Sequence, residues 1–148
     1  MSWMVLAVLS MSSPSEAAKN SLIRLPIGRI AHVTSKAPTT WGMSGMEMVK
    51  VTPSIGRETP IMRTLAWDAR TVEILSRTQI PPLRQRDVRR ITKGDRQIVV
   101  VRRYYLMEVM PEDARAAQMD KRSLADKWVS SISKVLPQVA PMPSRFGI

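Results

Sequence analysis

The chain has 148 residues, a formal net charge of +11 and an isoelectric point near 11.1. Hydrophobic residues make up 44% of it, which is enough to build the core of one domain. Cysteine is absent and His32 is the single histidine, so disulfide frameworks, thiolate metal sites, cysteine nucleophiles and multi-histidine sites are excluded.

The N-terminus carries an unbroken apolar run from Trp3 to Leu9, followed by small and polar residues. Ser15-Glu16-Ala17 suits signal-peptide cleavage, so residues 1–17 are predicted to be a signal peptide and the protein to be exported to the periplasm or its equivalent. No Lys or Arg precedes the run, which leaves a cytoplasmic location as the alternative. Because no stretch approaches the roughly 20 apolar residues of a membrane span, we do not expect an integral membrane protein.

Residues 18–60 contain scattered Pro, Gly and Met, and no helical period persists through them. We predict a loosely structured segment with short extended pieces at 21–25, 30–34 and 47–52. The methionines at 43, 46 and 48 favour a mobile apolar loop over a soft-metal site, because neither His nor Cys lies near them. His32 is predicted to be a structural residue.

A compact domain is predicted over residues 61–137, beginning with strands. Thr71–Thr78 alternates as a half-exposed strand does, and Val88 with Ile91 marks a second strand before a turn at 93–95. Residues 97–101 and 104–109 are rich in β-branched and aromatic residues, which favour strands. Arginines are poor hairpin-turn residues, so Arg102 and Arg103 predict a bulge within one long bent strand.

Two helices are expected to follow the strands. Pro111 begins a short helix that ends near Met119, and Asp120 caps a longer one that Pro137 ends, leaving residues 138–148 as a flexible tail. The longer helix has one apolar face, formed by Leu124, Trp128, Ile132, Val135 and Leu136. The order of elements predicts an α+β fold, with a small antiparallel sheet of three or four strands packed by both helices.

The C-terminal half resembles a known domain. The residues that carry the likeness are Arg77-Thr78, Pro82-Leu83, Tyr105-Leu106, Val109, Asp113-Ala114, Leu124-Ala125 and Trp128. They are similar to a domain of exported cyanobacterial proteins, found in the extramembrane regions of mechanosensitive-channel-like proteins and in small secreted relatives. The resemblance implies a packing pattern and an exported location, and it implies no defined chemistry.

The densest charge lies between residues 84 and 103, where eight cations face two aspartates. Arginine forks suit phosphate or carboxylate, and adjacent tyrosines can stack on bases or sugars. The alternative is that the cations protect strand edges from pairing. The predicted anion-binding residues are Arg84, Arg86, Arg89, Arg90, Arg96, Arg102 and Arg103, with Tyr104 and Tyr105 as stacking residues.

The carboxylates predict no catalytic site. Glu112 and Asp113 begin a helix, where acidic side chains complement the helix dipole. Glu108 lies among apolar strand residues, either as a buried acid with a raised pKa or, more commonly, paired with a nearby arginine. The sequence contains no glycine-rich phosphate loop, and we predict no catalytic residue, no metal site and no cofactor.

The sequence therefore predicts a non-catalytic accessory or binding domain of an exported protein, which binds an anionic partner through its arginines. Anionic lipid, polysaccharide or a protein surface fits an exported protein better than nucleic acid does. The alternative function is that of a basic, nucleic-acid-associated protein of the cytosol. Replacing Arg102 and Arg103 with Ser is expected to weaken anion binding and leave the fold intact.

Overall fold

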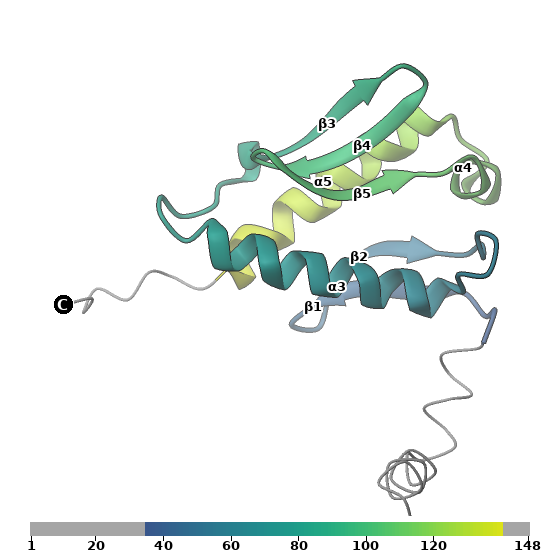
Figure 1. The fold of residues 1–148 in the computed structure, drawn as a ribbon, viewed down its shortest axis with the longest axis horizontal. Helices are drawn as coiled ribbons and strands as arrows, with labels where there is room; N and C mark the ends of the chain where they lie inside the picture. Colours follow the sequence, from purple (N-terminus) through teal and green to yellow (C-terminus); the bar gives the residue numbers. More distant parts are fainter. Residues whose placement is uncertain (1–34, 141–148) are drawn as a thin grey trace, which may run out of the picture. The chain divides into compact units, whose positions relative to one another are not determined.

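The computed structural model describes residues 35–140, which form an α+β unit as predicted (Figure 1). Several predictions concern residues outside this range: the signal peptide, the extended pieces at 21–25 and 30–34, His32, and residues 141–148 of the tail. The elements are β1 (Thr39–Met43), β2 (Met46–Val51), α3 (Pro60–Arg77), a 3-10 turn η1 (Gln85–Asp87), β3 (Val88–Lys93), β4 (Arg96–Val101), β5 (Tyr104–Val109), α4 (Pro111–Ala117) and α5 (Lys121–Val139).

Strands β3, β4 and β5 form an antiparallel sheet in that order, with β4 in the centre. All of β4 after Arg96 is buried, but its two faces differ. Val99 and Val101 belong to the hydrophobic core on the inner face, which α5 covers (Figure 1). Ile98 and Val100 point to the outer face and are buried without belonging to that core.

The segment predicted as one bent strand is a hairpin of two. Val101 pairs with Tyr104 in an antiparallel register, so Arg102 and Arg103 form a tight turn, and the prediction of a bulge at these residues is wrong. Arg102 adopts the left-handed region at φ 56°, which non-glycine residues seldom occupy. The irregularity of this pair of strands lies instead between Val99 and Val100.

The strand predicted at Thr71–Thr78 is also wrong, because these residues lie in and directly after α3. This helix begins with an N-cap, where the Thr59 hydroxyl accepts a hydrogen bond from the Met62 N–H, and Pro60 occupies the first turn. Buried threonines are tolerated because their hydroxyls donate to helix carbonyls, as Thr71 does to Trp67 at 2.7 Å. The alternation of apolar and polar residues over Thr71–Thr78 therefore belongs to a helix and does not indicate a strand.

The segment predicted to be loosely structured contains a hairpin, which corrects that expectation for residues 39–51. Strands β1 and β2 pair in antiparallel fashion around a turn at Ser44 and Gly45, both with positive φ. Trp41, Val49 and Val51 are fully buried. The three methionines belong to this hairpin and not to a mobile loop. Met48 is buried, and Met43 and Met46 pack against the core.

The C-terminal helices follow the prediction more closely. Helix α4 starts at Pro111, and the Asp120 carboxylate caps α5 by accepting from the Ser123 N–H at 2.9 Å. Pro137 does not end α5, which continues to Val139. The ring removes one backbone donor, while fully buried Leu136 and the packed Val139 hold the last turn on the core.

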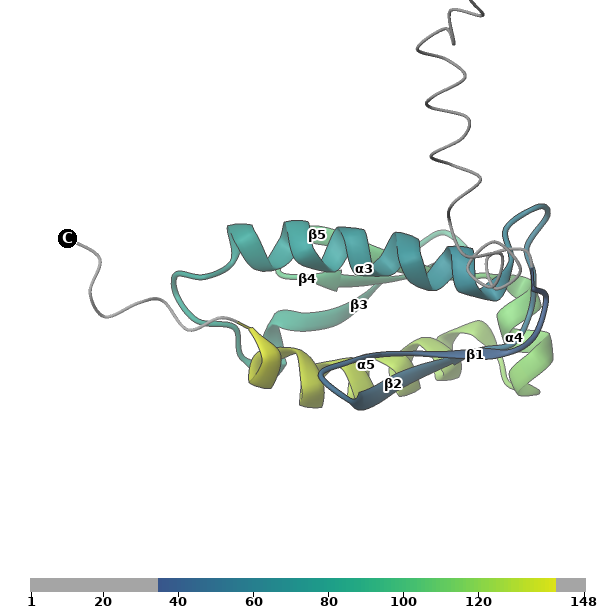
Figure 2. The same ribbon diagram turned by 90° about the horizontal axis from the view of Figure 1, so that it is seen from below.

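The core connects the two sheets through three tryptophans. Trp67 of α3 makes edge-to-face contacts with Trp41 of β1 and Trp128 of α5, at ring-centroid distances of 5.6 and 5.7 Å. Figure 2 shows α3 along one side of the described unit, with β5 at a similar level, and α5 with the β1–β2 hairpin on the other side. The outer face of the sheet and one side of α3 therefore have no covering element among residues 35–140.

Candidate functional site

Four of the predicted arginines meet at one corner of the molecule. Arg86, Arg89, Arg102 and Arg103 line a shallow surface hollow in which Asp87 is the single carboxylate. We call these four residues the arginine corner. It is built by η1, the start of β3 and the β4–β5 turn, because the antiparallel pairing of Val88 with Val101 brings these segments together.

Within the corner, the side chain of Arg102 is occupied by contacts inside the protein. Its guanidinium lies 3.3 Å from the Asp87 carboxylate and donates to the carbonyl oxygens of Thr78, Pro81 and Pro82. Its backbone N–H also donates to the Asp87 carbonyl at 2.6 Å. Arg102 thus fastens the loop that leaves α3 to the β4–β5 turn, and it neutralises the one acid in the hollow.

Two further predicted anion-binding residues are also occupied by partners. Arg90 lies on the inner face of the sheet and donates to the Asp126 carboxylate of α5 at 2.6 Å and to Gln97 at 2.9 Å. Arg96 pairs through two nitrogens with the Glu108 carboxylate, at 3.0 and 2.6 Å. The Arg96 hydrogen bond lowers the pKa of Glu108, so this carboxyl is not a buried acid with a raised pKa.

The remaining cations have no acidic partner among residues 35–140. Arg86 and Lys93 are exposed and unpaired there, Arg89 donates to the Arg102 carbonyl at 3.2 Å, and Arg103 donates to the Tyr104 hydroxyl at 3.1 Å. Arg84 is exposed beside them, and its backbone N–H donates to Asp87. The positive charge of the corner therefore exceeds what the described acids neutralise.

The tyrosines predicted to stack on a ligand each carry an arginine over the ring. The guanidinium carbons of Arg77 and Arg103 lie 5.9 and 5.2 Å from the ring centroid of half-buried Tyr104. Arg70 of α3 lies 5.0 Å from the ring centroid of exposed Tyr105. Cation–π contacts of this kind stabilise the arginine positions and occupy a face on which a base would stack.

One ion pair that the sequence did not predict lies deep in the structure. Arg63 of α3 and Asp113 of α4 have side chains only 5% and 2% exposed and are joined by two hydrogen bonds of 2.8 and 2.7 Å. Arg63 also donates to the Pro53 carbonyl, while Asp113 accepts from the Met110 N–H. The sequence assigned Asp113 to the helix dipole, and nothing in the spacing of residues 63 and 113 indicated that they meet.

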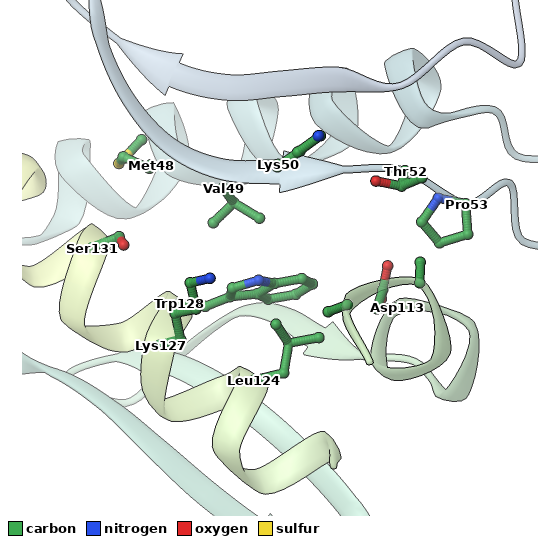
Figure 3. Close-up of a pocket in the computed structure, with 12 residues that line it drawn as sticks. Met48, Val49, Lys50, Thr52, Pro53, Asp113, Leu124, Lys127, Trp128 and Ser131 are labelled. Atoms are coloured by element: carbon green, nitrogen blue, oxygen red, sulfur yellow. The ribbon is translucent and has the colours of Figure 1, made fainter. Parts of the chain in front are cut away.

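A groove of about 220 Å³ separates β2 from α4 and α5. Figure 3 shows Trp128 lying between β2 and α5, with Val49 and Leu124 on either side of it. The carboxylate at one end belongs to Asp113, which Arg63 already neutralises. The groove is smaller than the roughly 300–1,000 Å³ of ligand pockets.

A family model described as a domain of unknown function (DUF8459) matches residues 42–139. The chain belongs to this family. The match begins inside β1 and includes β2, the three-stranded sheet and α5, so the arginine corner lies within the DUF8459 domain. No curated protein and no solved structure shows significant similarity to the chain. The DUF8459 description names neither a function nor a location, and the likeness to exported cyanobacterial domains stays a prediction.

Over residues 35–140 no helix combines the length and apolar character that crossing a membrane requires. No three His, Asp or Glu side chains in the same range converge as metal ligands would. The arginine corner is therefore the strongest candidate for a functional surface.

Proposed function

We propose that the DUF8459 domain is a non-catalytic binding module whose arginine corner binds an anionic partner. The observation that carries the proposal is the unequal use of the arginines. Arg102 takes up the single carboxylate of the hollow, which leaves Arg86, Arg89 and Arg103 directed at one surface without a described acidic partner. Guanidinium groups in this arrangement suit phosphate, sulfate or carboxylate.

An exported location is part of this proposal, supported by the apolar run Trp3–Leu9 and the cleavage-like Ser15-Glu16-Ala17. It favours lipid, polysaccharide or protein as the anion. The occupied rings of Tyr104 and Tyr105 weigh against the base stacking that the nucleic-acid alternative requires. N-terminal sequencing of the mature protein tests the location, since cleavage after Ala17 would exclude the cytosolic alternative.

The binding itself is tested by retention on heparin. The triple variant Arg86→Ser, Arg89→Ser and Arg103→Ser should elute at clearly lower salt than the wild type, because it displaces fewer counterions from heparin. The matched control removes three lysines away from the corner, Lys50→Ser, Lys127→Ser and Lys134→Ser. Equal loss of retention in both triple variants would show that net charge acts without a site and would refute the proposal.

A further inference from the structure

The large apolar side chains that are exposed among the described residues lie on α3, directly after it and on the three-stranded sheet. Those that stand out are Met62, Leu65 and Val72 of α3, Ile80 after α3, Ile91 of β3 and Tyr105 of β5. Val72 and Ile80 are the most accessible, at 64% and 79% exposed. Helical spacing places the α3 residues on the side of the helix opposite buried Trp67 and Ile74.

The strand residues lie on the outer face of the sheet. Ile91 pairs with Ile98, and Tyr105 pairs with Val100, and these two β4 residues are excluded from the core that lies against the inner face. Helix α3 flanks the sheet at β5, because Arg70 of α3 reaches over the Tyr105 ring and donates to the Leu106 carbonyl. Figure 2 likewise shows α3 and β5 on the same side of the unit.

Cations alternate with these apolar groups. Arg70, Arg89 and Lys93 have no described acidic partner, and Ile80 shares a surface hollow with Arg77, Arg102, Arg103 and Tyr104. Among the acids in this area, Glu73 and Glu108 are paired with Arg77 and Arg96. Asp68, between Leu65 and Val72 on α3, accepts a hydrogen bond from the Trp41 ring N–H, and Glu58 lines a hollow with Arg70 and Tyr105. We call the surface formed by Met62, Leu65, Val72, Ile80, Ile91, Tyr105, Arg70, Arg89 and Arg103 the apolar–basic face.

We propose that the apolar–basic face binds the surface of an anionic lipid bilayer, with the α3 side chains entering the headgroup boundary. This inference rests on the proposed function and names the source of the anion. A soluble polyanion would match the arginines but would leave the six apolar side chains in water. The boundary of an anionic bilayer offers negative headgroups beside an apolar layer, and it accommodates scattered apolar groups and tyrosine.

The geometry also distinguishes a bilayer from a protein partner. Stable protein interfaces have a closely packed apolar centre surrounded by a polar rim. On the apolar–basic face, Arg70 lies over the exposed ring of Tyr105, and Arg77 and Arg103 lie beside Ile80, so charge and apolar surface alternate. The fluid surface of a bilayer can contact such alternating charged and apolar groups without a complementary shape.

The experiment is flotation of the full chain with vesicles of phosphatidylcholine, with or without phosphatidylglycerol, beside heparin chromatography. The wild type should bind the anionic vesicles and only weakly the neutral ones. The double variant Leu65→Gln and Val72→Gln should lose at least about tenfold in vesicle affinity, because apolar burial is removed, and should keep its heparin retention. Glutamine is a good helix former, so α3 should persist.

Two further variants test the contributions separately. Leu65→Phe should bind vesicles more tightly than the wild type, which a purely structural role for this position would not produce. Arg89→Ser with Arg103→Ser should lower vesicle affinity at low salt by about fivefold for each cation. The control Lys127→Ser with Lys134→Ser, on α5, carries the same charge change and should have a smaller effect.

The outcomes that would overturn the inference differ from those that would overturn the proposed function. Heparin retention without binding to anionic vesicles refutes the bilayer and leaves the anion-binding module intact. Failure of both assays refutes both proposals. Unchanged vesicle binding in the glutamine variant refutes entry of the α3 side chains into the bilayer. If light scattering shows that the wild type is a dimer and this variant a monomer, a second copy of the chain covers the face instead. If the double variant loses the helical signal in its circular dichroism spectrum, the single variant Val72→Gln provides the same comparison.

Discussion

Arg102 and Arg103 are neighbours in a two-residue turn and have opposite roles. Arg102 donates to the carbonyls of Thr78, Pro81 and Pro82 and contacts Asp87, whereas Arg103 makes its hydrogen bond and its cation–π contact with Tyr104. From the sequence alone, both arginines are predicted to be equivalent anion-binding residues. The structure separates a residue that holds the loop from one that is available to a ligand.

This division predicts different results for the two serine variants. Arg102→Ser should lower the free energy of unfolding by about 1–3 kcal/mol, because several charge-assisted hydrogen bonds are lost. Arg103→Ser should change stability by no more than about 0.5 kcal/mol and should lower heparin retention more. Urea unfolding and heparin elution measure both effects. Equal destabilisation by the two substitutions would contradict the assignment.

The Arg96–Glu108 pair predicts an acid-dependent step in stability. Because Arg96 holds the pKa of Glu108 below its ordinary value in the folded state, the contribution is present above the ordinary glutamate pKa, about 4.3, and is lost as pH falls through the lowered pKa. Arg96→Gln should therefore be less stable than the wild type at neutral pH. Urea titrations at neutral and acid pH should show this difference disappearing in acid, and a constant difference would exclude the linkage.

At the scale of elements, the buried pair Arg63–Asp113 joins α3 to α4. Removing one partner leaves a charge in the core, so Asp113→Ala should cost about 3–5 kcal/mol. The double variant Arg63→Met and Asp113→Leu replaces both charges with apolar groups and should recover most of that loss. Thermal unfolding of the single and double variants makes the comparison, and an equally unstable double variant would show that the hydrogen bonds themselves dominate.

The elements also show where sequence reasoning succeeds. Strands β3 and β5 and helix α5 were predicted to within a few residues, because β5 is rich in strand-forming residues and α5 has one apolar face. Helix α3 was misread because Leu65 and Val72 are apolar on its exposed side while Trp67 and Ile74 are apolar on its buried side. Two apolar sides obscure the helical period and leave a local alternation that resembles a strand.

The candidate site was predictable only in its composition. The sequence indicated a basic cluster between residues 84 and 103, and the structure places Arg86, Arg89, Arg102 and Arg103 in one hollow. Which arginines are occupied depends on contacts with distant residues, such as that of Arg90 with Asp126. A single sequence gives no distance between such positions, so the division into paired and available arginines required the structure.

At the scale of the whole molecule, the domain includes the β1–β2 hairpin. A fragment of residues 61–137 lacks Trp41, Val49 and Val51, all of which are fully buried, and would expose Trp67 and Trp128. We expect residues 35–140 to unfold cooperatively and residues 61–137 to lack stable tertiary structure, because the total stability of a domain this size is only about 5–15 kcal/mol. Amide chemical-shift dispersion of both fragments tests this, and a well-dispersed spectrum for 61–137 would refute it.

The contact between the hairpin and α5 also determines when the chain can fold during synthesis. Trp41 and Val49 come from the first described elements, and Trp128 comes from the last, yet all three share one core. The hairpin leaves the ribosome early and must wait for α5, while two-stranded hairpins alone are at best marginally stable in water. Closing this long loop costs entropy before any core contact repays it. The nascent hairpin therefore exposes its tryptophan until α5 has been synthesised, and this helix then completes the core in one step.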